Sequence, residues 1–344
     1  MVAEPKKPTA PGGELELLRH IRRLSRSRRG GVRLGIGDDC AILRAKPGDE
    51  IAVTTDLSLD GRHFRLGWHP AESIGHRALA RGLSDLAAMG ARPLAAFLSL
   101  GLPRDLTSAS GRQKPWIERF YQGLLALADA HKTPLAGGDL SESPLALADV
   151  VLVGAVPIGR ALLRSSARPG DALYVTGRLG GASAGLLQLS DLAAKRPEST
   201  RALRIPQSAG PDLRPHLYPQ PRIEQGLWLQ RRGMATAAID ISDGLSTDVS
   251  HLCEESGVAA VIDADVLPIA PGATLDQALH GGEDYELLFT AAAAQRFPRS
   301  IGGIPIVRIG RIVRRRSGSP QVLLSTTAGQ KPLEPRGWEH FSFK

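Results

Sequence analysis

The stretch AAIDISDGLSTDV, residues 237–249, most constrains what this chain can fold into. An apolar run typical of a buried strand carries Asp240 in its middle, then breaks into Ser242-Asp243-Gly244 before a helical pattern begins. A charge inside a strand is costly unless it is paired or coordinates a metal ion. The stretch therefore predicts a strand followed by a helix, with acids at their junction that are paired or bind a cation.

The same arrangement recurs along the chain, with an Asp at the end of an apolar stretch and Gly, Ser or Thr beside it. The further cases are GIGDDCAIL with Asp38 and Asp39, VTTDLSLDGRHF with Thr54, Thr55 and Asp56, LSDLAAMG with Asp85, and LAGGDL with Asp139, while HGGEDYELLF adds Glu283 and Asp284. If four or five of these Asp side chains gather in one pocket, each pair of carboxylates at a distance of about 4 Å repels by about 4 kcal/mol at an effective dielectric constant of about 20. Only cations offset that cost. Mg²⁺ is the predicted cation because it takes a few carboxylates and completes its shell with phosphate oxygens and water.

Each acid also has an ordinary structural role open to it. These roles are a turn after Gly37 for Asp38 or Asp39, a helical ion pair with Arg81 for Asp85, a strand end for Asp139, and a helix N-cap for Asp243. Taken singly, each role is a sufficient explanation. The recurrence of one pattern at five sites favours the cation site.

Composition limits the class of protein. The 344 residues suggest two domains, and the two cysteines exclude a disulfide scaffold and indicate a reduced cytoplasm. We find no apolar run of about 18 residues, so no membrane span is expected. The net charge of +8 suits anionic ligands, but the arginine clusters at 19–29 and 314–316 have no interleaved aromatics, so no nucleic acid is expected as a partner. P-loop, protein-kinase, H-E-x-x-H and paired C-x-x-C motifs are absent from the sequence.

Strand-like and helical patterns alternate in both halves of the chain, which predicts an α/β or α+β fold. We expect a disordered tail at 1–13, an N-terminal domain at 14–158 and a C-terminal α/β domain at 159–344. Helical patterns cover 71–89, 115–131, 222–232 and 244–256, and strand patterns cover 51–59, 93–103, 235–241, 258–263, 284–291 and 304–310. The Pro- and Arg-rich segment 191–221 is expected to be a connecting excursion.

Seven segments, in order over residues 14–341, resemble the thiamine-monophosphate kinases, of the family that includes aminoimidazole ribonucleotide synthetase. They are LGIGDDCAIL, TTDLSLDGRHF, ALARGLSDLAAMGARP, LAGGDL, GRALLRSSARPGDALYVTG, IDISDGLSTDV and HGGEDYELLFT. The resemblance implies ATP-dependent phosphorylation of thiamine monophosphate to thiamine diphosphate by direct transfer with several Mg²⁺ ions. It also implies a homodimer whose N-terminal mixed sheets pair, with a C-terminal α/β domain over the nucleotide.

The resemblance also implies roles for individual residues. The metal ligands would be Asp39, Thr54, Thr55, Asp56, Asp85, Asp139, Asp240 and Asp243. The nucleotide would contact Gly138, Asp139, Arg164 and Ser242, and the thiamine end would contact His63, Glu283 and Trp338. The residues closest to the transfer would be Asp56, Asp243 and Arg164. Two departures from the family pattern are Gly82, where an Asn is usual, and Leu140-Ser141 after Asp139, where a Thr is usual.

Two other classes stay open. One is another enzyme of the superfamily, a selenophosphate synthetase or a hydrogenase maturation factor. Against these, Cys40 follows the GDD run, and the sequence ends in WEHFSFK without the C-terminal cysteine that the maturation factor needs. The other is a non-enzymatic basic protein that binds anions or RNA through its arginine clusters.

Overall fold

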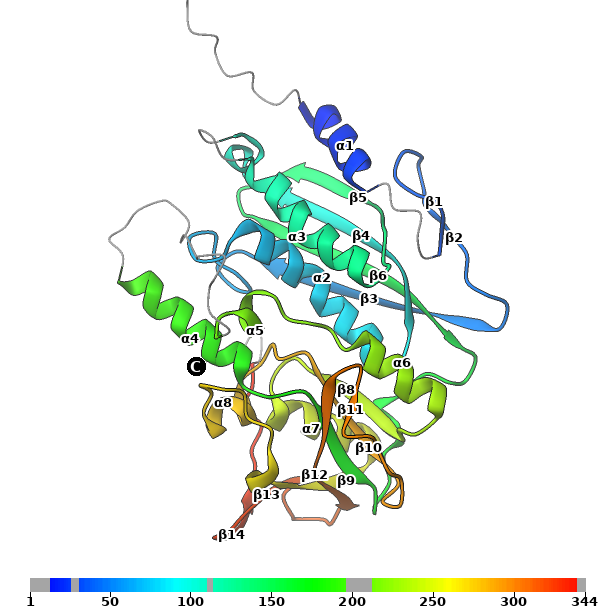
Figure 1. Cartoon of the computed structure of the whole chain (residues 1–344), viewed down its shortest axis with the longest axis vertical. Coiled ribbons are helices and arrows are strands. Elements are labelled where there is room, and N and C mark those ends of the chain that lie inside the picture. The colour runs from blue at the N-terminus through cyan, green and yellow to red at the C-terminus, as the bar shows by residue number, and fades with distance from the viewer. Residues whose placement is uncertain (1–12, 26–30, 110–113, 196–211, 339–344) are drawn as a thin grey trace, which may run out of the picture.

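The computed structural model describes residues 13–25, 31–109, 114–195 and 212–338, and Figure 1 shows a mixed α/β architecture with two main sheets. The fold class predicted from the sequence is confirmed. The predicted disordered tail at 1–13 lies outside the described residues except for Gly13, which begins the first helix. Most of the predicted excursion at 191–221 also lies outside them. No helix among the described residues is long and apolar enough to cross a membrane.

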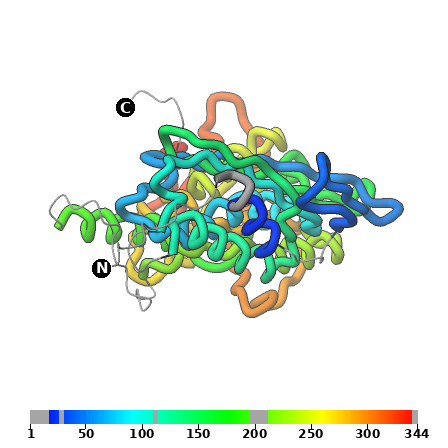
Figure 2. Tube along the Cα trace, turned by 90° about the horizontal axis from the view of Figure 1, so that it is seen from above, coloured from blue at the N-terminus to red at the C-terminus, as the bar shows by residue number. Residues whose placement is uncertain are grey.

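A four-stranded sheet in the N-terminal half carries many of the predicted site residues. Its order is β3-β6-β4-β5, with β4 and β5 parallel and the other pairs antiparallel. Its strands are β3 (Asp49–Leu59), β4 (Arg92–Leu102), β5 (Leu135–Glu142) and β6 (Leu147–Pro157). Helix α1 (Gly13–Leu24) and the small pair β1 (Val32–Leu34) and β2 (Ile42–Leu43) lie beside it. Figure 2 shows the blue segments around β1 and β2 projecting at one end of the molecule.

The two faces of this sheet differ. Helices α2 (Ala71–Ala88) and α3 (Trp116–Ala130) cover one face (Figure 1). On the other face β3 exposes Ile51, Val53 and Leu57 by 53, 63 and 45 %. Because successive side chains of a strand point to opposite faces, the odd-numbered residues of β3 lie on the open face and Thr54 and Asp56 lie on the helix-covered face. The strand pattern predicted for 51–59 is confirmed, with β3 beginning two residues earlier.

The second sheet has eight strands in the order β14-β13-β9-β12-β7-β10-β8, with β11 paired to β12. The strands are β7 (Ala172–Thr176), β8 (Ala237–Ile241), β9 (Val258–Asp263), β10 (Glu286–Ala291), β11 (Ser300–Ile301), β12 (Ile304–Arg314), β13 (Val322–Thr326) and β14 (Gly329–Pro332). Only β13 and β9 pair in parallel among these described strands. The domain boundary at 158/159 stays a prediction, and it falls between β6 of one sheet and β7 of the other.

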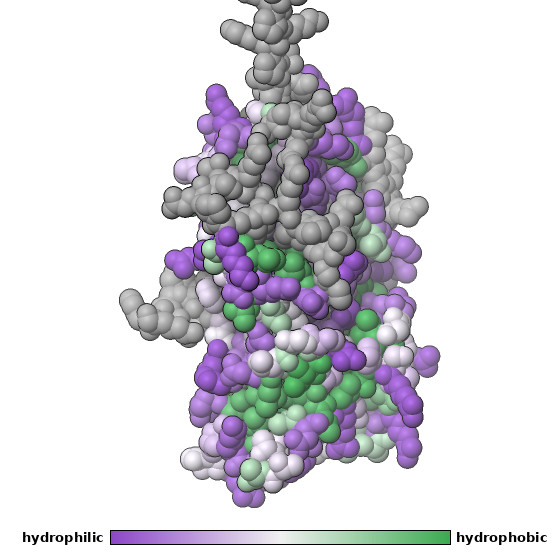
Figure 3. Space-filling model, turned by 60° about the vertical axis from the view of Figure 1, so that its left-hand side comes forward, coloured by the Kyte–Doolittle hydropathy of each residue, from purple (hydrophilic) through white to green (hydrophobic). Residues whose placement is uncertain are grey.

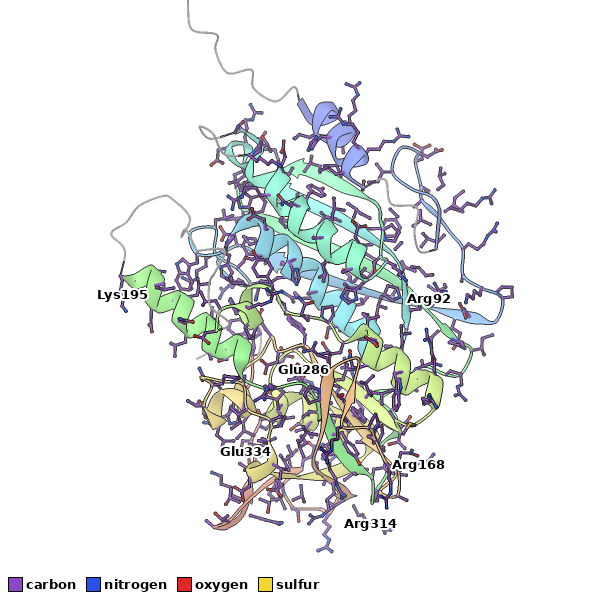
Figure 4. All side chains as sticks on the ribbon, in the orientation of Figure 1. Arg92, Arg168, Lys195, Glu286, Arg314 and Glu334 are labelled. Carbon is purple, nitrogen blue, oxygen red and sulfur yellow. The ribbon has the colours of Figure 1, made fainter. Side chains whose placement is uncertain are left out.

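Helix α2 lies between the two sheets. One apolar core contains Leu152 of β6, Leu83 of α2 and Phe289 of β10, and a second core lies on the other face of the large sheet. The remaining helices are α4 (Gly181–Ala194), α5 (Arg214–Leu217), α6 (Ile223–Arg232), α7 (Leu245–Ser256) and α8 (Leu275–His280), with short 3₁₀ turns η1 (Arg104–Thr107), η2 (Arg164–Ser166) and η3 (Ala264–Val266). Arg222, the N-cap of α6, forms an ion pair with Glu286 of β10, and Figure 4 labels Glu286.

Helix α4 was not predicted, because it begins in the glycine-rich segment GRLGGASAGL. Its N-cap Gly180 has a left-handed φ of +83°. The backbone N–H groups of Gly180 and Ala182 donate to the carboxylate of Asp284, at 2.6 and 3.1 Å, so an acid about a hundred residues away in sequence caps the helix. Helix α4 exposes Leu186, Leu187 and Leu192. Figure 3, which brings the left side of Figure 1 forward, shows hydrophobic residues gathered in patches on this side.

Candidate active site

A cavity of about 910 Å³ opens where α2, β3, β8 and α4 meet. Residues from both halves of the chain line it, among them Asp56, His63, Arg81, Asp85, His216, Asp240, Ser242, Asp243, Glu283, Tyr285 and Trp338. Nine of the predicted site residues, if Thr54 beside Asp85 is counted, are therefore at this cavity. The acids are at one part of its wall and the residues predicted for thiamine are at another.

The acid group joins β3, α2 and β8. Thr54 Oγ1 donates to Asp85 at 2.5 Å, and Ser84 Oγ donates to the buried Asp240 at 2.7 Å. Asp56 pairs with Arg81, with 3.3 Å between Oδ1 and Nη2. The helical ion pair predicted as an alternative for Asp85 is thus not formed, since Arg81 turns to Asp56 instead. Helix α2 approaches the sheet at Gly82, where an added Cβ would lie 2.8 Å from Leu152.

Burial dominates the charge state of these acids. It raises the pKa of Asp85 to about 7 and that of Asp240 to about 6, and each further acid nearby adds to the rise. Burial also raises the pKa of Asp56, although Arg81 opposes it. The described residues supply one paired cation, Arg81, for this group. Carboxylate oxygens held together at this cost are a donor set that suits a hard divalent cation.

The loop after β8 is held by hydrogen bonds to the side chain of Asp248. The backbone N–H groups of Ser242, Asp243 and Gly244 all donate to the buried carboxylate of Asp248, at 3.0–3.1 Å. This arrangement leaves the side chain of Asp243 at the cavity wall. The predicted N-cap role of Asp243 is wrong, because the N-cap of α7 is Gly244. The carboxylate of Asp248, four to six residues further along the chain, organises the loop instead.

The other part of the cavity holds a compensated acid. Arg77 Nη2 donates to Glu283 Oε1 at 2.6 Å, and His216 Nδ1 lies 3.5 Å from Oε2. Burial alone would raise the pKa of Glu283, but Arg77, His216 and Arg81 outweigh it and lower the pKa to about 2. Glu283 and Tyr285 both have left-handed backbone conformations, with φ of +67° and +50°. Such strain in non-glycine residues concentrates at functional sites.

His63 and Trp338 complete this part. The backbone N–H of Leu59 donates to His63 Nδ1 at 3.1 Å, which fixes the ring at the cavity. The backbone N–H of Trp338 donates to the carbonyl of Asp243 at 3.2 Å, and the Trp338 side chain is 52 % exposed. His216 also lies 3.0 Å from His69, from Nε2 to Nε2, and burial lowers the pKa of His69 to about 4 and that of His216 well below its ordinary value.

A second cavity of about 460 Å³ contains the remaining predicted acids. Asp39, Gly138 and Asp139 line it together with Asp38 and Cys40. Thr55 is in neither cavity, because strand alternation places it on the open face of the sheet, where its hydroxyl donates to Asp149 at 2.9 Å. In this single chain the predicted ligands therefore do not meet in one pocket. The strand order explains the division, since β3 and β5 are opposite edges of the sheet.

Two further observations concern the predicted ligands. Among the described residues, no group of three or more His, Cys, Asp or Glu is arranged to hold a metal ion. Arg164 in η2 is outside both cavities, but its charge lowers the pKa of Asp85 and Asp240, so it lies near the acid group. Some of the predicted metal ligands therefore lie together at the main cavity, and others line the second cavity.

Sequence reasoning missed the residues that support the site. Arg77, Arg81, His216 and Asp248 were not predicted as part of it. Arg77 and Arg81 precede Asp85 at intervals of four residues, a spacing that places them on neighbouring turns of α2 and was visible in the sequence. Their partners Glu283 and Asp56 lie on other parts of the fold, so the ion pairs themselves could not be predicted from the sequence.

Comparison with known proteins identifies the relatives of this chain. The AIR synthase related protein N-terminal domain model matches residues 37–161, and the corresponding C-terminal domain model matches 168–322. The thiamine-monophosphate kinase of Salmonella typhimurium is 39 % identical over 312 residues, covering 87 % of this chain and 90 % of that protein. The chain belongs to the thiamine-monophosphate kinase family.

Solved structures agree with this membership. The crystal structure of thiamine-monophosphate kinase from Stenotrophomonas maltophilia K279a has a TM-score of 0.75 and 39 % identity, covering 90 % of this chain and 95 % of that one. The structure of AaThiL complexed with AMPPCP and TMP has a TM-score of 0.71 and 31 % identity, covering 96 % and 97 %. The fold of a thiamine-monophosphate kinase is therefore shared over nearly the whole chain.

Proposed function

We propose that this protein transfers the γ-phosphoryl group of ATP to thiamine monophosphate and releases ADP and thiamine diphosphate. The observation that carries the proposal is one cavity that combines an acid group with raised pKa values, Asp56, Asp85 and Asp240, with an acid whose pKa is lowered, Glu283. Family membership supports it, as does a relative solved with an ATP analogue and thiamine monophosphate. The same support excludes the non-enzymatic anion- or RNA-binding class from our proposal.

The reaction does not require a strong general base. At neutral pH the acceptor phosphate already carries an anionic oxygen, which forms a bond to the γ-phosphorus while the bond from that phosphorus to the β–γ bridging oxygen breaks. Catalysis then consists of alignment and charge neutralisation. We assign Asp56, Asp243 and Arg164 to the reacting phosphates. Arg164 carries a planar guanidinium that forks onto phosphate oxygens.

Magnesium is part of the proposal. The residues that would hold it are Asp56, Asp85, Asp240 and Asp243 with Thr54 at the main cavity, Asp39 and Asp139 at the second cavity, and Thr55 on the open face of the sheet. Bound there, Mg²⁺ would neutralise the charge of phosphates from both substrates. The chain itself contributes oxygen donors and their alignment. We assign Gly138, Asp139, Arg164 and Ser242 to the nucleotide, and His63, Glu283 and Trp338 to thiamine.

The proposal includes a cytoplasmic homodimer joined through the open face of the small sheet. Ile51, Val53 and Leu57 form an exposed apolar row there. Such a row is typical of an interface rather than of a solvated surface. Replacing Val53 with Glu should convert the dimer into a monomer, because an unpaired charge would be buried at its centre. Light scattering after size exclusion measures this, and a Val53→Glu protein of unchanged mass would contradict the interface.

A turnover assay tests the function. Purified protein, ATP, Mg²⁺ and thiamine monophosphate are incubated, and the products are separated by chromatography. We expect ADP and thiamine diphosphate in equal amounts. ATP consumption without thiamine diphosphate, or with selenide or a carbamoyl group as the required co-substrate, would assign the protein to another branch of the superfamily. Absence of any turnover, with nucleic acid retained by the protein, would favour the binding class.

A further inference from the structure

Helix α2 carries three charged residues at intervals of four: Arg77, Arg81 and Asp85. Arg77 holds Glu283, and Asp85 accepts from Thr54. Four residues of an α-helix advance about 6 Å along its axis. Arg81 is therefore midway between the compensated acid and the acid group, on the wall of the cavity that contains both.

The bonding of Arg81 is incomplete. Its Nη2 lies 3.3 Å from Asp56 Oδ1, while its Nη1 is buried and has no hydrogen-bond partner among the described residues. The side chain is 19 % exposed. A guanidinium stays charged and presents its donors in a rigid fork. A buried charged donor without an acceptor costs free energy, so its retention needs an explanation such as a ligand that completes it.

The geometry points to Arg81 as the residue that binds the phosphate group of the acceptor, and this rests on the proposed function. Asp56 occupies one arm of the fork, and a phosphate entering between Glu283 and Asp56 would supply oxygens to the buried arm. The acceptor is favoured over the nucleotide because Arg77, one turn from Arg81 on α2, holds Glu283, which we assign to thiamine. Of the residues assigned to the nucleotide, Ser242 also lines this cavity, whereas Gly138 and Asp139 line the other cavity at the far edge of the sheet. Arg81 would thereby distinguish thiamine monophosphate from thiamine, which lacks the phosphate.

Ligand pairs and matched variants test this assignment. Calorimetric titration without nucleotide, in the presence of Mg²⁺, gives the affinities of thiamine monophosphate and thiamine for the wild type, Arg81→Met, Arg81→Lys and Arg92→Met. Arg92 is the matched control, because it also pairs with a carboxylate of β3, Asp49, at 3.3 Å and is outside the cavity. Figure 4 shows it on the side of the molecule opposite Lys195 at the end of α4.

Arg81→Met should weaken binding of thiamine monophosphate by at least about tenfold, the loss expected for a hydrogen bond to a charged group, and leave thiamine binding unchanged. Arg81→Lys should fall between, because it keeps the charge and loses the fork. Arg92→Met should change neither affinity. Thermal unfolding verifies that each variant is folded, and Arg81→Gln replaces Arg81→Met if the latter is not.

Two outcomes would overturn the assignment while leaving the proposed function intact. One is an equal loss for thiamine and thiamine monophosphate, which would make Arg81 a structural residue. The other is an unchanged affinity for thiamine monophosphate in Arg81→Met. A wild type that neither binds nor phosphorylates thiamine monophosphate would overturn the proposed function, and this inference with it.

Discussion

Asp85 and Glu283 line the same cavity, and burial acts on both, yet the pKa of Asp85 is raised to about 7 while that of Glu283 is lowered to about 2. The difference comes from their neighbours. Glu283 has Arg77 and His216 beside it, whereas Asp85 faces Asp240 and Asp56. The protein thus balances Glu283, the acid that we assign to thiamine, with its own side chains, whereas the acid group has Arg81 as its one paired cation among the described residues.

The largest effect should come from removing a carboxylate that we assign to the reacting phosphates. Replacing Asp243 with Ala should reduce turnover by about 100- to 1,000-fold, the range for loss of one group that stabilises transition-state charge. Folding should survive, because Asp248 holds the backbone of the Ser242–Gly244 loop. Steady-state kinetics at saturating Mg²⁺ measures the loss. Asp276→Ala, at a carboxylate 73 % exposed on α8, is the control, and full turnover by Asp243→Ala would contradict the assignment.

The acid group should lower the free energy of unfolding at neutral pH, although turnover requires it. An acid whose folded pKa is raised destabilises the native state as pH rises from its unfolded pKa of 3.8 to its folded pKa, here about 7 for Asp85. Asp85→Asn should therefore increase the free energy of unfolding at pH 8 by about 1–3 kcal/mol and have no such effect at pH 4. It should also reduce turnover. Urea unfolding at both pH values tests this, and a less stable Asp85→Asn at pH 8 would show that the group is already compensated.

Glu283 should behave in the opposite way. Its lowered pKa stabilises the native state above its unfolded pKa of 4.5, and this contribution disappears as pH falls toward about 2. Glu283→Gln should therefore destabilise the protein at pH 7 and leave Arg77 buried without its carboxylate. We also expect the KM for thiamine monophosphate to rise about tenfold, with the KM for ATP unchanged. Equal changes in both KM values would place Glu283 outside the thiamine part of the cavity.

The smallest effect should come from the rim. Trp338 is half exposed, so a Trp338→Leu substitution loses stacking on the substrate but little packing. The KM for thiamine monophosphate should rise about threefold, in line with about 0.5–1 kcal/mol for an exposed aromatic contact with a cation. Phenylalanine at this position should restore most of the affinity. A drop in the unfolding temperature of Trp338→Leu without a change in KM would make Trp338 a packing residue.

The sequence was sufficient to predict the fold class and the part of each strand that carries an acid, since period-two alternation and buried charges are local signals. It was not sufficient to predict which acids share a cavity. Thr54 and Thr55 are adjacent in sequence and on opposite faces of β3, and Asp56 and Asp139 are on opposite edge strands. Strand order depends on pairing between segments that are far apart in sequence, so the spacing of residues along the chain does not predict it.

Cross-element contacts explain the other omissions. Asp284 lies next to a predicted site residue, but its role is to cap α4, which begins at Gly181. Asp248 supports the loop before α7 through three backbone N–H groups. Both acids are visible in the sequence, yet a carboxylate that accepts backbone N–H groups has no sequence pattern that separates it from a metal ligand.

The central claim, that the acid group is balanced by divalent cations and Glu283 by the protein, is tested most directly by calorimetric titration of Mg²⁺ near pH 6.5 in two buffers of different ionisation enthalpy. Because the raised pKa values of Asp85 and Asp240 leave them partly protonated at that pH, Mg²⁺ binding to the wild type should release protons. Asp85→Asn should reduce both the affinity and the proton release, and Glu283→Gln should change neither. Mg²⁺ binding that releases no protons, or that Asp85→Asn leaves intact, would contradict the account.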